Sequence, residues 1–146
     1  MSHTRPSTDE EWTWQCDRVI PSDAAVGRRL LDDVLQQLET LHWARPDIFG
    51  INLAVEEALV NAILHGNALD QTKTVRFSCH VSPKRIRVEI TDEGPGFDPD
   101  SLPDPTTPCH LDRPGGRGVM LMRAFMSHVE FRDHGSHVVL EKERVP

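Results

Sequence analysis

The residues of this chain that could bind or orient a ligand gather in three motifs, the first being EEALVNAILHGN at residues 56–67. In a helix, Glu57, Asn61 and His65 are spaced i, i+4 and i+8, so they form one stripe along one side. Glu56 lies about 140° from Asn61 around a helix of ~3.6 residues per turn. Only Glu57 can therefore share a site with Asn61, although a solvated polar stripe explains the same spacing.

The second motif, DEGPGF at residues 92–97, follows directly on a predicted strand. Asp92 would stand at the end of that strand, and Gly94 and Gly96 would open a turn. A short carboxylate in this position often orients a ligand, and glycines let the ligand approach the backbone. A plain turn uses the same residue types, so this motif alone does not decide between the two interpretations.

The third motif, RPGGRGVML at residues 113–121, places a cluster of glycines at the start of a predicted helix. Free backbone N–H groups and the helix dipole favour an anion at such a start. Glycine-rich helix starts are common, however, so this motif also carries little weight by itself.

Five strands are predicted wherever apolar and polar residues alternate. They cover residues 12–20, 73–81, 84–92, 128–133 and 136–143. Short turns at Ser82–Pro83 and His134–Gly135 would join two pairs of neighbouring strands into hairpins. Alternation of this kind favours antiparallel pairing over a parallel sheet that is buried on both faces.

Three helices are predicted from apolar residues at helical spacing. They cover residues 24–41, about 46–64, and 118–127. Pro46 is tolerated in a first helical turn, and Gly66 is a natural end for the second helix. Three methionines of the last helix stand at near-helical spacing and are expected in the core: Met120, Met122 and Met126.

The order of these elements predicts an α+β two-layer sandwich, with the helices on one face of a mostly antiparallel mixed sheet. We expect a single domain at residues 12–146 and a disordered tail at residues 1–11. The proline-rich segment at about 94–117 is too long for an ordinary connection, so it is expected to be a lid, a binding loop or disorder.

Composition narrows the classes of function. A net charge of −7, from 16 basic and 23 acidic residues, argues against a general nucleic-acid-binding surface. No uninterrupted apolar run approaches the roughly 18 residues of a membrane span, and the polar N-terminus lacks the centre of a signal peptide. We therefore expect a cytoplasmic protein, whose three cysteines are reduced thiols.

A zinc site is the main alternative use of the cysteines, because Cys79–His80 and Cys109–His110 could together supply two sulfur and two nitrogen ligands. Adjacent residues of a strand point to opposite faces of the sheet. Cys79 and His80 are therefore poorly placed to chelate one ion, and the zinc interpretation is disfavoured.

The joint order of the motifs is more specific than any one of them. An acid-xxx-Asn helix, a strand-end DxGxG, a long loop and a GxG helix start resemble the GHKL ATP-binding superfamily, which includes histidine kinases, gyrase B and MutL. Within it, EEALVNAILHGN, TDEGPGFDP and GGRGVMLMRAFMSHVEF are similar to the anti-sigma factor serine kinases. The resemblance covers roughly Trp12 to Glu143 and implies the Bergerat fold.

The resemblance implies a role for each motif residue. Asn61 would coordinate Mg²⁺, for which a neutral oxygen ligand is suitable. Glu57 would act as general base or orient the attacking hydroxyl. Asp92 would accept a hydrogen bond from the adenine amino group, in a pocket shaped by Gly96, and Gly94 is a further nucleotide-binding candidate.

The same resemblance places the phosphates at the third motif. Gly116 and Gly118 would present backbone donors to them while a lid at about 94–117 closes. Arg113 is a candidate for stabilising charge on the γ-phosphate, and Arg117 is its rival. Three further residues complete the nucleotide-binding candidates: His65, Gly115 and Val119.

The implied function is that of an ATP- and Mg²⁺-dependent serine/threonine protein kinase. It would act as an anti-sigma factor, phosphorylate an anti-anti-sigma partner of the STAS type and sequester a sigma factor, without direct contact with nucleic acid or membrane. A homodimer is possible. Two alternatives stay open: an ATP-binding regulatory module that transfers nothing, and a detached histidine-kinase catalytic domain.

Overall fold

The computed structural model describes residues 12–96 and 116–144, and of residues 116 and 117 the backbone alone. The predicted tail and most of the predicted lid lie outside these residues. The elements, in chain order, are β1 (Trp14–Pro21), α2 (Ala24–Thr40), α3 (Arg45–Val60), the π-helix η1 (Asn61–Gly66), β2 (Thr74–Val81), β3 (Arg85–Thr91), α4 (Gly116–Phe125), β4 (His128–Arg132), the 3₁₀ turn η3 (Asp133–Gly135) and β5 (His137–Glu143).

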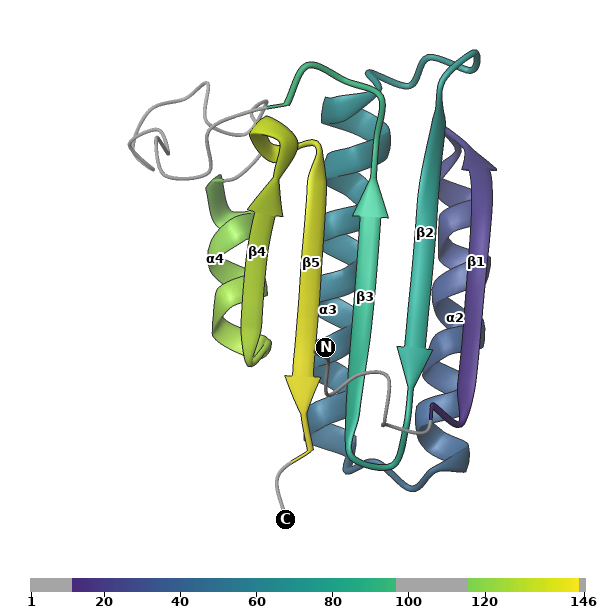
Figure 1. Ribbon diagram of the computed structural model, residues 1–146, viewed down its shortest axis with the longest axis vertical. Coiled ribbons are helices and arrows are strands. Elements are labelled where there is room, and N and C mark those ends of the chain that lie inside the picture. The colour runs from purple at the N-terminus through teal and green to yellow at the C-terminus, as the bar shows by residue number, and fades with distance from the viewer. Residues whose placement is uncertain (1–11, 97–115, 145–146) are drawn as a thin grey trace, which may run out of the picture.

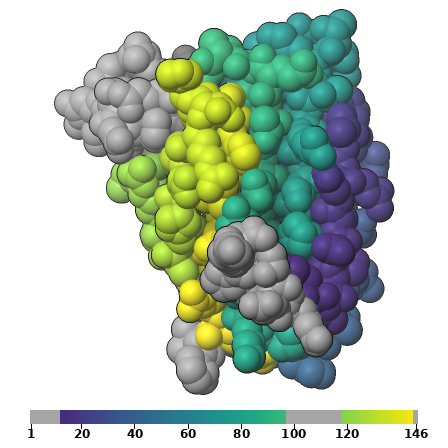
Figure 2. Space-filling view, viewed as in Figure 1, coloured from purple at the N-terminus to yellow at the C-terminus, as the bar shows by residue number. Residues whose placement is uncertain are grey.

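The strands form one sheet in the order β1-β2-β3-β5-β4, and each pair of neighbours within the described residues is antiparallel. The three α-helices cover one face of this sheet, as Figure 1 shows. On the opposite face, which Figure 2 views, strands β2, β3 and β5 are seen without a covering helix. The predicted two-layer sandwich with helices on one face is confirmed.

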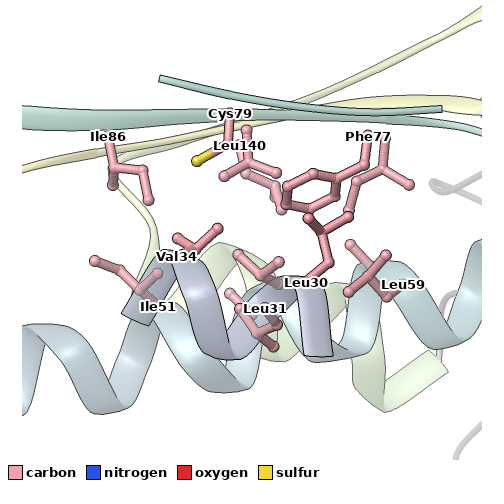
Figure 3. Packing of buried hydrophobic residues seen from close by; sticks show 14 of the residues in the cluster. Leu30, Leu31, Val34, Ile51, Leu59, Phe77, Cys79, Ile86 and Leu140 are labelled. Atoms are coloured by element: carbon pink, nitrogen blue, oxygen red, sulfur yellow. The ribbon is translucent and has the colours of Figure 1, made fainter. Parts of the chain in front are cut away.

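The core lies between the sheet and the helices, because alternate residues of the central strands point to the same layer. Val75, Phe77 and Cys79 of β2 are fully buried, while their neighbours along the strand remain partly or fully exposed. Figure 3 shows Phe77 and Cys79 directed toward side chains of α2 and α3, such as Val34 and Leu59. This packing holds the long helix α3 against the centre of the sheet.

The end of the second predicted helix differs from an ordinary α-helix. α3 gives way at Asn61 to the π-helix η1, in which the Asn67 N–H donates to the Ala62 carbonyl over 2.9 Å. A π-turn carries one residue more than an α-turn and is frequent at functional sites. Gly66 ends the helix, as predicted. The Asn61 N–H still donates to the Glu57 carbonyl as in an α-helix, but His65 follows Asn61 through a wider turn than regular helical spacing assumes.

By length and a mean hydropathy of 1.3, the continuous stretch Arg45–Gly66 passes a test for a membrane-crossing helix. Core helices of soluble proteins pass the same test. This stretch includes Glu56 and Glu57, and it buries Ile51 and Val55 completely against the rest of the fold. Its apolar character is therefore accounted for by its place in the core.

Helix α4 corrects one prediction about the methionines. Met122 and Met126 are buried as expected, whereas the side chain of Met120 is 63% exposed. A helix that packs by one face buries only that stripe, and Met120 lies off it. Cys79 is buried and His80 is only partly covered, in agreement with strand alternation, while Cys109 and His110 lie outside the described residues.

Candidate functional site

A pocket forms where the end of α3, η1 and the beginning of the loop after β3 meet the β4–β5 hairpin. Asn61 and His65 line it from the helix side, and Asp92 and Gly96 line it from the loop. Its remaining wall includes apolar residues of the sheet and of α4, together with the hairpin. These wall residues are Ile90, Met122, Phe131, Gly135, Ser136 and Val138. The first two sequence motifs thus meet at one site.

The third motif reaches the same site through the start of α4. A Cβ atom added to Gly118 would lie 2.8 Å from Glu57 Oε1 and 3.5 Å from Asn61 Nδ2. Glycine at this position therefore lets the backbone of α4 approach both polar side chains. The structure brings Glu57, Asn61 and Gly118 together at one edge of the pocket.

The neighbouring acid points elsewhere. Glu56 Oε2 accepts a hydrogen bond from Arg28 Nη1 of α2 over 3.3 Å. Arg28 also donates to Asn52 and Asp32, so Glu56 belongs to a polar cluster between α2 and α3. The helical argument that separated Glu57 from Glu56 agrees with this placement.

The amide of Asn61 has an unusual environment. Its Nδ2 atom is shielded from solvent and has no hydrogen-bond partner among the described residues. Leaving a buried polar group unpaired costs about 1–3 kcal/mol. Such a group therefore indicates a partner, for example an ion or a ligand, that binds at this position. A half-turn of the amide presents its oxygen instead of its nitrogen. A neutral amide oxygen is a ligand that suits Mg²⁺, so the residue present at this position fits the ion.

Asp92 is held at the opposite side of the pocket. Its backbone N–H donates to the Ser136 carbonyl over 2.9 Å, and its Oδ1 accepts from the Gly94 N–H over 2.8 Å. Burial raises the pKa of the Asp92 carboxyl, and the hydrogen bond from Gly94 only partly opposes this. A carboxylate in this setting is well suited to accept a hydrogen bond from a ligand that replaces water.

Three glycines allow backbone segments to pack tightly around Asp92. A Cβ atom on Gly66 would lie 2.4 Å from the Asp92 carboxyl group, and one on Gly94 would lie 1.9 Å from the Gly66 carbonyl oxygen. Gly96 has a φ of +84°, and its Cβ would lie 2.0 Å from the His134 carbonyl oxygen. Gly94 and Gly96 are thus required by the protein's own backbone, and not only by the approach of a ligand.

Several predicted site residues belong to the segment just before α4 or to the start of this helix. Arg113 and Gly115 lie outside the described residues. Gly116 and Arg117 begin α4, with their side chains undescribed. The side chain of Val119 is fully buried, so only its backbone could contact a ligand.

Sequence reasoning missed the contribution of the β4–β5 hairpin and of Gly66. Ser136 and Gly135 line the pocket, although they stand more than 40 residues after Asp92 in the chain. Gly66 was interpreted only as a helix end, whereas it also makes room for the Asp92 carboxyl. The signal available was the turn chemistry of DHGS, which indicates a hairpin but not its position beside the pocket.

Comparison with known sequences connects this geometry to a family. Residues 20–142 match the family described as Histidine kinase-like ATPase domain. The serine/threonine-protein kinase BtrW of Bordetella bronchiseptica is 28% identical over 122 residues, which are 78% of this chain and 86% of that protein. The serine-protein kinase RsbW of Halalkalibacterium halodurans is 33% identical over 106 residues, 68% of this chain and 64% of that protein.

An anti-sigma F factor of Clostridium perfringens is 28% identical over 104 residues, 66% of this chain and 73% of that protein. A crystal structure of RsbU and RsbW domains from Mycobacterium tuberculosis matches the fold with a TM-score of 0.57 at 15% identity. That match covers 92% of this chain and 34% of the longer one. At this identity the structural likeness concerns the fold alone.

Proposed function

The chain belongs to the histidine kinase-like ATPase domain family, and on that premise we propose that it is an ATP- and Mg²⁺-dependent serine/threonine protein kinase. We propose further that it acts as an anti-sigma factor, which phosphorylates an anti-anti-sigma partner of the STAS type and sequesters a sigma factor. The named relatives, which are serine kinases and anti-sigma factors, support this proposal. We place this activity in the cytoplasm.

The observation that carries the proposal is the meeting of Glu57, Asn61 and the start of α4 at one edge of a pocket that Asp92 closes on the other side. This arrangement provides separate places for the adenine and for the phosphates of ATP. The adenine would bind at Asp92, and its amino group would donate a hydrogen bond to the Asp92 carboxylate. The phosphates would lie along the α4 start, where Gly116 and Gly118 offer backbone N–H groups.

The Mg²⁺ ion would be held by Asn61, and when bound it supplies charge neutralisation for the phosphates. Glu57 would take the proton of the partner's serine hydroxyl while that oxygen forms a bond to the γ-phosphorus. The bond from the γ-phosphorus to the bridging oxygen breaks, and ADP carries that oxygen away. Positioning and charge stabilisation supply most of the catalysis in such transfers.

The direct test is incubation of the chain with Mg²⁺, γ-labelled ATP and candidate STAS-domain proteins, followed by identification of the labelled residue. Phosphoserine or phosphothreonine on the partner is expected. ATP binding with no transfer to any STAS-domain partner would favour the regulatory module instead. Label on a histidine would favour the histidine-kinase alternative.

The Mg²⁺ assignment has a test of its own. Asn61→Ala should reduce ATP affinity in the presence of Mg²⁺ by tenfold or more, about 1.4 kcal/mol, and leave affinity in EDTA nearly unchanged. Calorimetric titrations with and without Mg²⁺ measure both values. An equal loss under the two conditions would mean that Asn61 serves the pocket in another way.

A further inference from the structure

One fully buried side chain ties together three segments around the site. Asn67, the residue after η1, has an exposure of 0%. Its Oδ1 accepts a hydrogen bond from the Glu93 N–H over 2.8 Å. Its Nδ2 donates to Ser22 Oγ over 3.0 Å and to the Thr74 carbonyl over 2.9 Å. The amide thereby joins the turn after β3 to the start of β2 and to the residues that precede α2.

The hydrogen-bond network continues beyond the amide. Ser22 Oγ donates to the Lys73 carbonyl over 2.8 Å, and the Glu93 carboxylate accepts from Thr74 Oγ1 over 2.9 Å. Within the described residues, three polar side chains are buried, and two of them, Ser22 and Asn67, belong to this network. Burying such groups is costly unless they are paired, and here each is paired.

The backbone of Asn67 acts on the other side of the same site. Its N–H donates to the Ala62 carbonyl over 2.9 Å and closes the last turn of the π-helix η1, which begins at Asn61 and contains His65. Its side chain holds the amide of Glu93, the residue next to Asp92 in the chain. One residue therefore spans the two walls of the pocket.

We propose that Asn67 is a positioning residue, which fixes the turn at Asp92 to Gly96 against η1 and thereby sets the affinity and base selectivity of the nucleotide site. The inference rests on the proposed nucleotide-binding function and concerns which nucleotide that site accepts. Asn67 touches no ligand in this scheme. It acts by accepting a hydrogen bond from the Glu93 N–H, and this bond keeps the Asp92 carboxylate in a fixed position in the pocket.

The chemistry of the amide explains why other residues would not serve. An apolar side chain of similar size would fill the space but leave the Glu93 N–H, the Thr74 carbonyl and Ser22 Oγ without their partner. Aspartate keeps the acceptor for Glu93 but loses both donors. These differences make substitutions at this position informative.

The experiment compares Asn67→Ala, Asn67→Asp and a control, Ser22→Ala, which removes one acceptor of Nδ2 and leaves the bond to Glu93 in place. Calorimetry measures the Kd for ADP and for inosine diphosphate, which has a carbonyl where adenine has its amino group. Circular dichroism and thermal melts verify that each variant is folded. Amide hydrogen exchange at Glu93 and Gly94, in the chain without nucleotide, reports on the turn directly.

Asn67→Ala is expected to weaken ADP binding about tenfold or more, to narrow the preference for ADP over inosine diphosphate, and to speed exchange of the Glu93 amide. Asn67→Asp should lower thermal stability but keep the base preference, because its oxygen still holds Glu93. Ser22→Ala should leave both the preference and the Glu93 exchange close to those of the unaltered chain.

The inference is overturned if folded Asn67→Ala binds ADP with unaltered affinity and selectivity, or if its Glu93 amide exchanges at the original rate. Should Asn67→Ala fail to fold, loss of base preference in folded Asn67→Asp would overturn it as well. If the unaltered chain bound neither nucleotide, the proposed function would fail, and the exchange of Glu93 would still decide whether Asn67 orders this turn.

Discussion

The two ends of the sheet, at the top and bottom of Figure 1, differ in how their polar groups are paired. At the lower end, Ser82 Oγ accepts from the Lys84 and Arg85 N–H groups, and Trp43 Nε1 donates to the Ser82 carbonyl. Arg144 donates to the carbonyls of Leu41, His42 and Pro83. The hydrogen bonds of Ser82, Trp43 and Arg144 thus clamp several chain segments together at this end.

At the upper end, Asn61 Nδ2 is buried without a partner among the described residues, and burial raises the pKa of the Asp92 carboxyl. Glycines replace larger residues at the closest backbone contacts. The fold therefore places this hydrogen-bonded clamp at one end of the strands, and the unpaired Asn61 amide and the buried Asp92 carboxyl at the other end. Substitutions at the two ends should therefore separate activity from stability.

The largest expected effect is on phosphotransfer at the upper end. Glu57→Gln should lower the transfer rate by about 10²–10⁴-fold, because it removes the general base. The free energy of unfolding and the affinity for ADP should hardly change. Glu56→Gln is the matched control, since Glu56 pairs with Arg28 at a half-exposed site and such pairs contribute about 0–1 kcal/mol. Equal transfer rates in the two variants would contradict the assignment of Glu57.

The second-largest effect is expected from a methyl group added between two backbone segments at the upper end. Gly94→Ala sets a Cβ 1.9 Å from the Gly66 carbonyl oxygen, so one of the two segments must move. We expect a loss of about 2–4 kcal/mol in the free energy of unfolding, together with loss of nucleotide binding.

Gly27→Ala provides the contrast for that variant. Its Cβ would meet only side-chain ends, Ile63 Cδ1 at 3.3 Å and the Leu59 methyl groups at 3.8 and 3.9 Å, and alanine favours a helix by about 1 kcal/mol over glycine. Urea denaturation and ADP titration should show little change. If Gly94→Ala behaved like Gly27→Ala, the tight packing around Asp92 would not be needed for the site.

At the lower end, a substitution is expected to change stability and leave nucleotide binding unchanged. Arg144→Met removes the donors to three carbonyls and should lower the free energy of unfolding by about 1–3 kcal/mol. The Kd for ADP should stay the same, because the clamp lies at the far end of β3 from Asp92. Chemical denaturation and calorimetry measure the two quantities, and weakened ADP binding in this variant would show that the ends are coupled.

The smallest effect concerns pH. Because burial raises the folded-state pKa of Asp92 above its ordinary value of 3.8, the native state holds this proton more tightly than the unfolded state. The protonated group therefore contributes stability below its pKa in the unfolded state. This contribution is lost as the pH rises through the higher pKa of the folded state. Asp92→Asn, which cannot ionise, should be slightly more stable than the unaltered chain at pH 7, with the gap closing in acid.

Ionisation of Asp92 lowers stability but is required for ADP binding. Accepting the adenine amino group requires the carboxylate, so ADP affinity should fall as the pH drops through the raised pKa. Denaturation curves and ADP titrations from pH 4 to pH 7 check both trends. An Asp92→Asn variant that is less stable than the unaltered chain at pH 7 would contradict the cost assigned to burial.

Local patterns in the sequence were sufficient to predict the sandwich. The alternation in TVRFSCHV and RIRVEIT reports directly which strand face is buried, and turn residues mark the hairpins. The separation of Glu57 from Glu56 also follows from local geometry, since four helical residues span slightly more than one turn, whereas five do not bring two side chains to the same side. These features depend only on residues that are close along the chain.

Other features depend on contacts between distant segments, and the sequence carries little local sign of them. The last turn of η1 is closed by Asn67, and the Asn67 side chain is hydrogen-bonded to Ser22, Thr74 and Glu93. Met120 has the spacing of a core residue but lies on a side of α4 that nothing described here covers. Tertiary packing, not intrinsic preference, decided each of these cases.

The π-turn also bears on how this lineage can change. It holds one residue that an α-helix would not need, so loss of any single residue between Asn61 and Gly66 would restore a regular helix. Because the extra residue is taken up within the turn, such a deletion would leave α3 and the chain after Gly66 close to their present places. It would change which side chains this segment presents to the pocket, which Asn61 and His65 now line. The pocket and a regular helix therefore make opposite demands on the length of this segment.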